Sequence, residues 1–281
     1  MMGYLLFMML MSCTALSLAQ DRVIDKYPGA TMLKETFDQD TQTGLAKRLL
    51  AHRHVTLAKG AGPDGSDAIR VAYVGYQRGS QRVVDRFPLN FAAESATLSF
   101  DVCFEKDFQW IRGGKLHGLG PKRRVTGGRK REKDKWSARI MWRRDGRGST
   151  YLYDQDMTQK WGVGRTSDEP VFTAGQWHRV VLQVSLNTPG QQNGFARIFV
   201  DGQEVINHEE VEFRRIGGND TQIQQFLFST FHGGNTPRWA PVDAEGNFTT
   251  VYAYFDNIVI TEGIQTPEAD DLKAASEAPE P

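Results

Sequence analysis

The chain has 281 residues, with 34 Lys+Arg against 34 Asp+Glu. With 40% hydrophobic residues, the composition is typical of a globular protein and excludes collagen, coiled coils and wholesale disorder. The balanced charge also argues against a protein coated in positive charge for nonspecific nucleic-acid binding. The charge is unevenly spread, however, because residues 106–147 hold 15 basic and 4 acidic residues, which leaves 19 basic and 30 acidic residues elsewhere. The neutral total conceals a cationic segment.

The N-terminal segment predicts export. Residues 1–20 carry no charged side chain, are apolar from 4 to 11, and end in small residues before Gln20. We expect residues 1–19 to be a signal peptide, which makes the protein secreted or periplasmic without stable membrane association. Leu10–Cys13 also resembles a bacterial lipobox, so lipid anchoring at Cys13 is the alternative.

The cysteines and the C-terminal segment indicate the limits of the folded domain. Without the leader, Cys103 is the last cysteine, so no intramolecular disulfide is expected and Cys103 reads as a small buried residue. Residues 266–281 are rich in Ala, Glu and Pro and predict a flexible acidic tail. The folded domain is therefore expected to span residues 20–265.

Short alternating segments separated by Gly, Asn, Asp and Pro fill the middle of the chain. They predict strands at residues 68–75, 96–104, 137–142, 150–154, 179–185, 196–200, 225–231 and 251–260. The best helix candidate is 44–53, and no repeat or linker divides the chain. This pattern predicts an all-β, single-domain antiparallel β-sandwich. The hairpin signal Val-Asp-Gly at 200–202, after Gly-x-Trp-His at 175–178, is typical of carbohydrate-associated jelly rolls.

The strand at 137–142 presents an unusual polar face. When the strand is extended to residue 143, period two places Ser137, Arg139, Met141 and Arg143 on one face, which is polar and cationic. The opposite face is apolar and belongs to the core. The next strand places Tyr151 and Tyr153 together, and a Gly-rich turn joins the two strands. If the strands form a hairpin, the arginine, serine and tyrosine side chains converge on one face.

This set suits removal of a proton next to a carboxylate. Cations offset the charge that builds on the carboxylate as the proton leaves. A tyrosine whose pKa is lowered by those cations can act as the base, while another hydroxyl protonates the leaving oxygen. The reaction is β-elimination of a uronic-acid polymer and needs no cofactor. The ordinary alternative is that the tyrosines pack and the arginines are solvated.

Several motifs resemble polysaccharide lyase family 14, which includes alginate lyases and glucuronan lyases. The likeness runs from about residue 100 to 260. It is carried by GGKLHGL at 113–119, WSARIMWRRDG at 136–146, YLY at 151–153, VSLNTPG at 184–190, VDG at 200–202, FSTFHGG at 228–234 and YAYFDN at 252–257.

The resemblance implies a β-jelly roll whose concave face forms the polysaccharide cleft. It adds Lys115 to the arginine, serine and tyrosine residues that the two predicted strands place on one face. Lys115 and Arg139 are expected to neutralise the uronate carboxylate, and Tyr151 and Tyr153 to share the base and acid roles, in an order left open. Ser137 is expected to orient the sugar, and Arg143 to bind substrate.

Two histidines depart from the family pattern. His117 stands where the family usually has Pro, and His232 stands where it tends to have Phe. Either histidine is expected to bind a sugar, shift the pH optimum or replace a tyrosine as base; a packed or exposed histidine is the alternative. The segment 121–135 is more basic than expected for the family, so it either recruits an anionic polymer or is a solvated loop.

More than one function is compatible with the sequence. Alginate is the expected substrate, a glucuronan is the second candidate, and a non-catalytic lectin-like module that binds acidic glycans is the alternative class. Nucleic-acid binding is disfavoured because the basic segment lacks interleaved aromatic residues. A retaining glycosidase needs two close carboxylates and is disfavoured because the Glu-x-Asp-x-x-Glu strand pattern of jelly-roll glycosidases is absent. The six histidines show no ligand spacing, so no metal is expected. The oligomeric state is left open.

Overall fold

The computed structural model describes residues 29–130 and 132–265. The predicted signal peptide at 1–19, the lipid-anchor candidate Cys13 and the predicted tail at 266–281 lie outside the described residues. Across the described part of the chain, no helix is long and apolar enough to cross a membrane.

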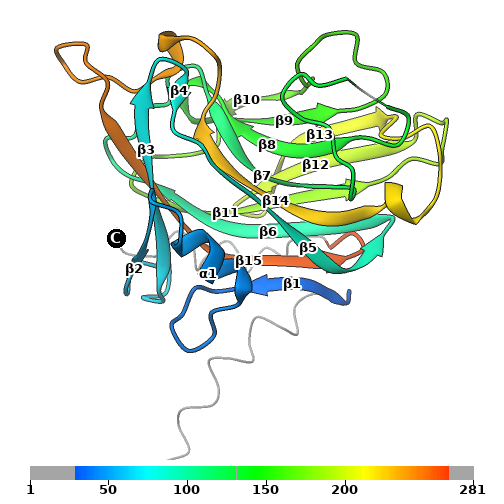
Figure 1. The fold of residues 1–281 in the computed structure, drawn as a ribbon, viewed down its shortest axis with the longest axis horizontal. Coiled ribbons are helices and arrows are strands. Elements are labelled where there is room, and N and C mark those ends of the chain that lie inside the picture. Colours follow the sequence, from blue (N-terminus) through cyan, green and yellow to red (C-terminus); the bar gives the residue numbers. More distant parts are fainter. Residues whose placement is uncertain (1–28, 131, 266–281) are drawn as a thin grey trace, which may run out of the picture.

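Two antiparallel sheets form the molecule and pack face to face (Figure 1). The lower sheet has nine strands: β13 (Gln203–Val211), β12 (Gly194–Val200), β11 (Trp177–Ser185), β6 (Ser95–Phe104), β15 (Thr250–Glu262), β3 (Ala68–Tyr76) and β2 (Val55–Ala58) in order, with β1 (Thr31–Glu35) beside β15 and β4 (Gly79–Ser80) beside β3. The upper sheet has six strands: β10 (Thr166–Pro170), β9 (Arg147–Tyr153), β8 (Ser137–Trp142), β7 (Gly114–Gly120), β14 (Ile223–His232) and β5 (Val83–Ala93). The predicted antiparallel β-sandwich is confirmed.

The predicted helix is shorter than expected. Helix α1 (Gly44–Leu50) begins where the sequence places it, and Thr43 caps it by accepting a hydrogen bond from the Leu45 N–H at 3.1 Å. Its Leu45 and Leu49 are buried in the main hydrophobic core. Both predicted hairpins are also present. The turn after β12 has Asp201 at φ 50° and Gly202 at φ 75°, the left-handed pair that a tight hairpin requires.

The core lies between the two sheets and follows the alternation of the strands. In β8, Ala138, Ile140 and Trp142 have no exposed surface and belong to the main hydrophobic core. Arg139 and Met141, on the opposite face, point away from this core into the cleft described below. The period-two assignment of this strand is therefore confirmed: one face of β8 packs in the core, and the other face lines the cleft.

A buried acidic group lies on the other side of the nine-stranded sheet. Asp101 of β6 faces Asp256 of β15 across the strand pair. Arg179 binds both Asp101 oxygens, and the Asn257 amide donates to Asp101 Oδ2 at 2.8 Å. Asp256 accepts from the Ser66 hydroxyl at 2.7 Å. Burial, with the nearby Asp101 charge adding to it, raises the pKa of Asp256 to about 8.

Stability is therefore expected to fall as Asp256 ionises. The pKa of Asp256 is higher in the folded chain than in the unfolded chain. Its contribution to the free energy of unfolding is therefore complete below the unfolded pKa near 3.8 and is lost as pH rises through about 8. Each pH unit in this window lowers the free energy of unfolding by about 1.4 kcal/mol. Asp256→Asn cannot ionise, so its Tm should fall less than that of the wild type between pH 5 and 9.

Thermal unfolding followed by circular dichroism at several pH values measures this. Asp107→Asn, at an exposed carboxylate, is the matched control and should track the wild type across the series. Parallel Tm curves for Asp256→Asn and the wild type would contradict the role given to Asp256.

Candidate active site

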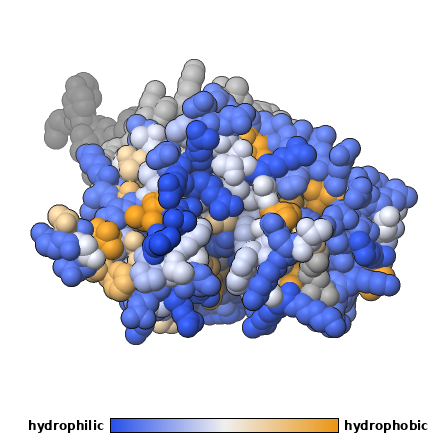
Figure 2. Space-filling model, turned by 90° about the horizontal axis from the view of Figure 1, so that it is seen from above, coloured by the Kyte–Doolittle hydropathy of each residue, from blue (hydrophilic) through white to orange (hydrophobic). Residues whose placement is uncertain are grey.

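The outer face of the six-stranded sheet is hollowed into a cleft of about 890 Å³, visible between hydrophilic ridges when the molecule is seen from above (Figure 2). Its described lining has seven basic residues and one acidic residue, Asp85. The basic residues are Arg82, Arg86, Lys115, Arg124, Arg129, Arg139 and Arg143. Asp85 is itself paired with Arg48, outside the cleft. The cleft is therefore strongly cationic and suits a polyanion.

Three side chains meet at the floor of the cleft. Lys115 Nζ lies 3.3 Å from the centroid of the Tyr151 ring, and Arg139 Cζ lies 5.3 Å from the same centroid. Lys115, Arg139 and Tyr151 are 9%, 7% and 8% exposed, so little water reaches them. The structure thus brings together a lysine, an arginine and a tyrosine that the sequence placed on three separate segments.

Strand register creates this convergence. Arg139 of β8 lies opposite Tyr151 of β9, and Lys115 of β7 lies opposite Met141 of β8. Gly118 of β7 lies beside Arg139, where a Cβ atom would be 2.1 Å from the carbonyl oxygen of Ala138 and 2.6 Å from Arg139 Cγ. Only glycine leaves room for the arginine stem to lie across β7.

The cations at the floor have no anionic partner. Among the residues described, no carboxylate forms an ion pair with Lys115, Arg139 or Arg143, and the buried Nε atoms of both arginines have no hydrogen-bond partner. Burial, reinforced by Arg139, Arg143 and Arg82, lowers the pKa of Lys115 well below its ordinary value. An unpaired buried arginine is costly, so the site is built to receive an anion.

Tyr151 does not have the lowered pKa that the sequence predicted. Burial and the neighbouring Tyr153 hydroxyl raise the pKa of Tyr151, and the opposing effect of Arg139 is smaller. The expectation that cations lower the pKa of this tyrosine is therefore wrong. Burial could not be read from the sequence, and it outweighs the cationic field.

Tyr153 and Ser137 lie beneath the cleft wall instead of on its surface, and both are fully buried. The Tyr153 hydroxyl accepts a hydrogen bond from the Gly128 N–H at 2.8 Å and lies 3.5 Å from the Tyr151 hydroxyl. The Ser137 hydroxyl donates to the Val125 carbonyl at 2.8 Å. The predicted sugar contact of Ser137 does not fit this position, because its hydroxyl holds the basic loop (the segment 121–135) in place through Val125.

His117 lies in the core, contrary to its predicted contact with sugar. Two residues of β7, Leu116 and His117, oppose Ile140 of β8, which is a β-bulge. The bulge shifts the alternation, so His117 turns inward while Lys115 faces the cleft. The ring is fully buried and packs 4.2 Å from the Phe228 ring. Burial lowers the pKa of His117 to about 3, so it stays neutral.

His232 is also internal. It has no exposed surface, its Nε2 lies 2.6 Å from the Gln109 carbonyl, and its ring stacks on Phe108 at 5.3 Å. Burial lowers the pKa of His232 to about 4. Neither histidine can bind sugar or serve as the base from these positions. Within residues 29–130 and 132–265, no group of three His, Cys, Asp or Glu residues could hold a metal ion.

Several cleft residues were missed from the sequence. Arg82 lies just before β5 and Arg86 lies within it, while Trp161 comes from a loop and Trp239 ends the short 3-10 helix η3 (Pro237–Trp239). The signal for β5 was present as alternation around Val83 and Phe87, which are buried, while Arg86 between them faces the cleft. No comparable pattern marks the two tryptophans, because the positions of segments between strands depend on tertiary structure.

Comparison with known proteins places this geometry in a family. The model for polysaccharide lyase 14 matches residues 71–258, more than half of the chain. A search of curated proteins found no match.

Three solved structures illustrate the shared fold. The alginate lyase Aly36B has a TM-score of 0.65 and 21% identity, over 84% of this chain and 98% of that one. A double mutant of Aly36B is bound to an alginate trisaccharide. The PL-14 alginate lyase of Aplysia kurodai has a TM-score of 0.57 and 20% identity, over 83% of this chain and 100% of that one. The endo-β-1,4-glucuronan lyase of the fungus Trichoderma reesei has a TM-score of 0.52 and 16% identity, over 78% of this chain and 92% of that one.

At these identities the structures establish a common fold, and the family model adds the sequence relationship over the strands that build the cleft. The chain belongs to polysaccharide lyase family 14 and is a polysaccharide lyase.

Proposed function

We propose that the protein cleaves a uronic-acid polymer, with alginate as substrate, by β-elimination. The observation that carries the proposal is the convergence of Lys115, Arg139 and Tyr151 at the floor of a cationic cleft, where no carboxylate of the described residues pairs with the two cations. A uronate supplies the missing anion through its own carboxylate. A neutral glycan would leave the buried guanidinium groups unpaired.

The arginines are the groups that neutralise the substrate carboxylate. Arg139 and Arg143 remain charged even though burial lowers the pKa of each guanidinium. Their unpartnered Nε atoms offer donors to a carboxylate in the cleft. As the proton leaves the carbon next to that carboxylate, the developing charge is stabilised by these fixed cations, which do not have to reorganise.

Lys115 is the best candidate for the base. Its pKa is lowered well below the ordinary value, so the amine is more readily neutral than an exposed lysine, whereas the raised pKa of Tyr151 keeps its hydroxyl protonated. Lys115 takes the proton from C5 of the uronate, the C4–O4 bond breaks, and Tyr151 donates its proton to O4. The products are an unsaturated uronate and a new hydroxyl. The Lys115 proton then returns to the tyrosinate through solvent.

This assignment changes the roles expected from the sequence. Lys115 moves from carboxylate binding to proton abstraction, and the acid role goes to Tyr151. Tyr153 serves as a support, because its hydroxyl is occupied by the Gly128 N–H and is fully buried. The charge-binding role stays with Arg139 and is shared with Arg143.

Alginate is favoured over glucuronan by the kinds of relatives found. Aly36B and the Aplysia kurodai enzyme are alginate lyases, and a double mutant of Aly36B is bound to an alginate trisaccharide. The glucuronan lyase of Trichoderma reesei has a lower TM-score of 0.52. Glucuronan is therefore the second candidate substrate.

Export remains a proposal based on residues 1–19. An uncharged, apolar segment followed by small residues is typical of a secretory leader. Mass spectrometry of the protein recovered from the native host should find a mature N-terminus at Gln20. An intact N-terminal segment would contradict cleavage, and a diacylglycerol adduct on Cys13 would indicate the lipid anchor instead.

The proposed function is tested by incubating the protein with alginate and glucuronan and following the ultraviolet absorbance of unsaturated uronate. We expect activity on alginate to exceed that on glucuronan. Tyr151→Phe removes the proton donor and should lower kcat by about 100-fold or more, while polymer binding survives. Tyr252→Phe, on the other sheet, is the matched control and should retain wild-type kcat. If the wild type releases no unsaturated product from either polymer, the lyase proposal fails.

Lys115→Arg separates the two roles available to the lysine. Arginine keeps the positive charge but cannot act as a base near neutral pH. If Lys115 is the base, kcat should fall by about 100-fold or more. If it only neutralises the carboxylate, kcat should remain within about tenfold of the wild type. Stopped assays on alginate measure both outcomes.

The pH profile gives an independent check. A base with a lowered pKa is active once deprotonated, so kcat/KM of the wild type should rise with pH and reach its plateau well below the ordinary lysine pKa near 10.5. This limb should disappear in any residual activity of Lys115→Arg. A rise that occurs only near the ordinary lysine pKa would show that burial does not tune this group.

A further inference from the structure

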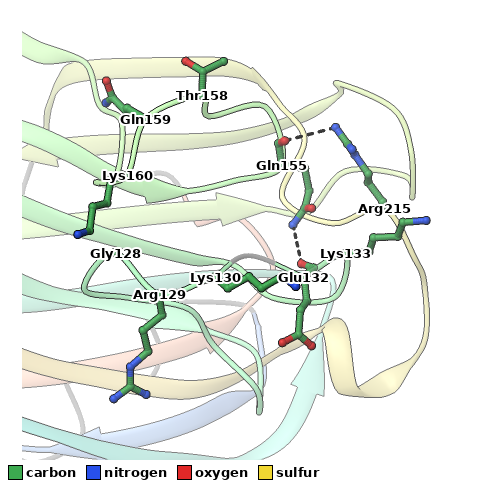
Figure 3. A pocket seen from close by; sticks show the side chains of 10 residues that line it. All are labelled: Gly128, Arg129, Lys130, Glu132, Lys133, Gln155, Thr158, Gln159, Lys160 and Arg215. Atoms are coloured by element: carbon green, nitrogen blue, oxygen red, sulfur yellow. Dashed lines mark hydrogen bonds between the residues drawn. The ribbon is translucent and has the colours of Figure 1, made fainter.

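A second cavity, of about 510 Å³, lies beside the cleft (Figure 3). Five of the ten residues that line it are basic and one, Glu132, is acidic. The basic residues are Arg129, Lys130, Lys133, Lys160 and Arg215. None of the side chains assigned to proton transfer or carboxylate binding lines this cavity, so the proposed reaction leaves it unexplained.

Most of these charges are available to a ligand. Glu132 is paired outside the lining, with Arg123 at 3.1 Å and with Lys135. Arg215 is paired with Glu212 at 3.0 Å. Over the part of the chain described, the other four basic residues of the cavity have no ion pair. The result is a local cationic excess that its own carboxylates do not neutralise.

The wall of the cavity is tied together rather than left as free loops. The Gln155 side-chain amide donates to the backbone carbonyls of Glu132 at 3.2 Å, Lys135 at 3.1 Å and Phe213 at 3.1 Å. The Arg215 N–H donates to the Lys133 carbonyl at 2.9 Å. Figure 3 shows Gln155 between Glu132 and Arg215, bonded to both. These contacts hold the basic loop at a fixed distance from the segment after β9.

The cavity adjoins the cleft. Arg129 lines both, and the boundary between them is the Gly127–Gly128 turn packed against Trp161. A Cβ atom on Gly128 would lie 2.9 Å from the Trp161 ring, so glycine allows the turn to pack closely against the indole. Trp161 is 47% exposed, lines the cleft, and has Lys160 Nζ 5.3 Å from its ring centroid. An exposed indole offers an apolar face for a sugar ring between two cationic regions.

We propose that this cavity is a distal subsite that binds uronate residues of the same polymer beyond those held at the floor of the cleft. The occupant is the substrate chain, because the two cationic regions share Arg129 and meet at the Gly127–Gly128 turn beside the exposed Trp161 ring. The proposal rests on the lyase function above. It assigns the basic loop a local contact with polymer, in place of long-range attraction alone.

The test compares a long substrate with a short one. Lys130→Gln/Lys133→Gln removes two cavity charges at exposed positions, and Lys47→Gln/Lys59→Gln removes two exposed charges elsewhere as the matched control. Steady-state kinetics are measured on alginate polymer and on a purified tetrasaccharide. The cavity variant should raise KM for the polymer about fivefold more than KM for the tetrasaccharide, with little change in kcat. The control should leave the ratio of the two KM values at the wild-type value.

Binding is measured separately by affinity electrophoresis of the wild type and both variants in gels that contain alginate. Weaker retardation of the cavity variant than of the control supports the subsite even if no substrate is turned over. The binding result therefore tests the subsite separately from the lyase activity. Equal KM changes for polymer and tetrasaccharide, or equal effects of the cavity and control variants, would overturn the distal subsite and leave long-range attraction as the role of the loop.

Discussion

The structure depends on holding like charges together where water is scarce. Lys115, Arg139 and Arg143 converge at a floor that exposes less than a tenth of the lysine and of Arg139, with no carboxylate paired to them among the described residues. Such an arrangement opposes folding, because buried charges lose hydration and repel one another. The lysine responds by a lowered pKa, and the arginines keep their charge. The same imbalance that costs stability creates affinity for a carboxylate.

The surrounding sandwich must therefore fix these side chains firmly. The β8–β9 register sets Arg139 against Tyr151, and Gly118 opens the space that the arginine stem occupies. Ser137 and Tyr153 hold the basic loop from below through Val125 and Gly128. The apolar face of β8 adds the packing energy that the polar face lacks. Strained or repulsive groups persist at functional sites only where the rest of the structure over-determines their positions.

Sequence patterns anticipated the hairpin but not its electrostatics. Alternation in residues 137–142 was enough to separate the core face from the cleft face, because both faces repeat every second residue. Strand β5 was missed because Pro88 and three nearby charged residues obscure its pattern, and its position at the sheet edge tolerates proline. The β7 bulge reversed the expected direction of His117, since bulges depend on both partner strands. Burial reversed the expected pKa shift of Tyr151.

The equal numbers of basic and acidic residues acquire a meaning from this arrangement. The cleft and the cavity gather basic residues from β5, β7, β8 and the 121–135 loop, whereas the buried Asp101–Asp256 pair lies on the other sheet. A polyanion therefore meets attraction on one face, while the acidic remainder discourages binding elsewhere. Within that face the cations differ in burial: those at the floor are desolvated, and we assign them to the reacting sugar, whereas those of the cavity are hydrated, and we assign them to neighbouring sugars of the polymer. The depth of a cation below the surface therefore separates the residues assigned to catalysis from those assigned to polymer binding.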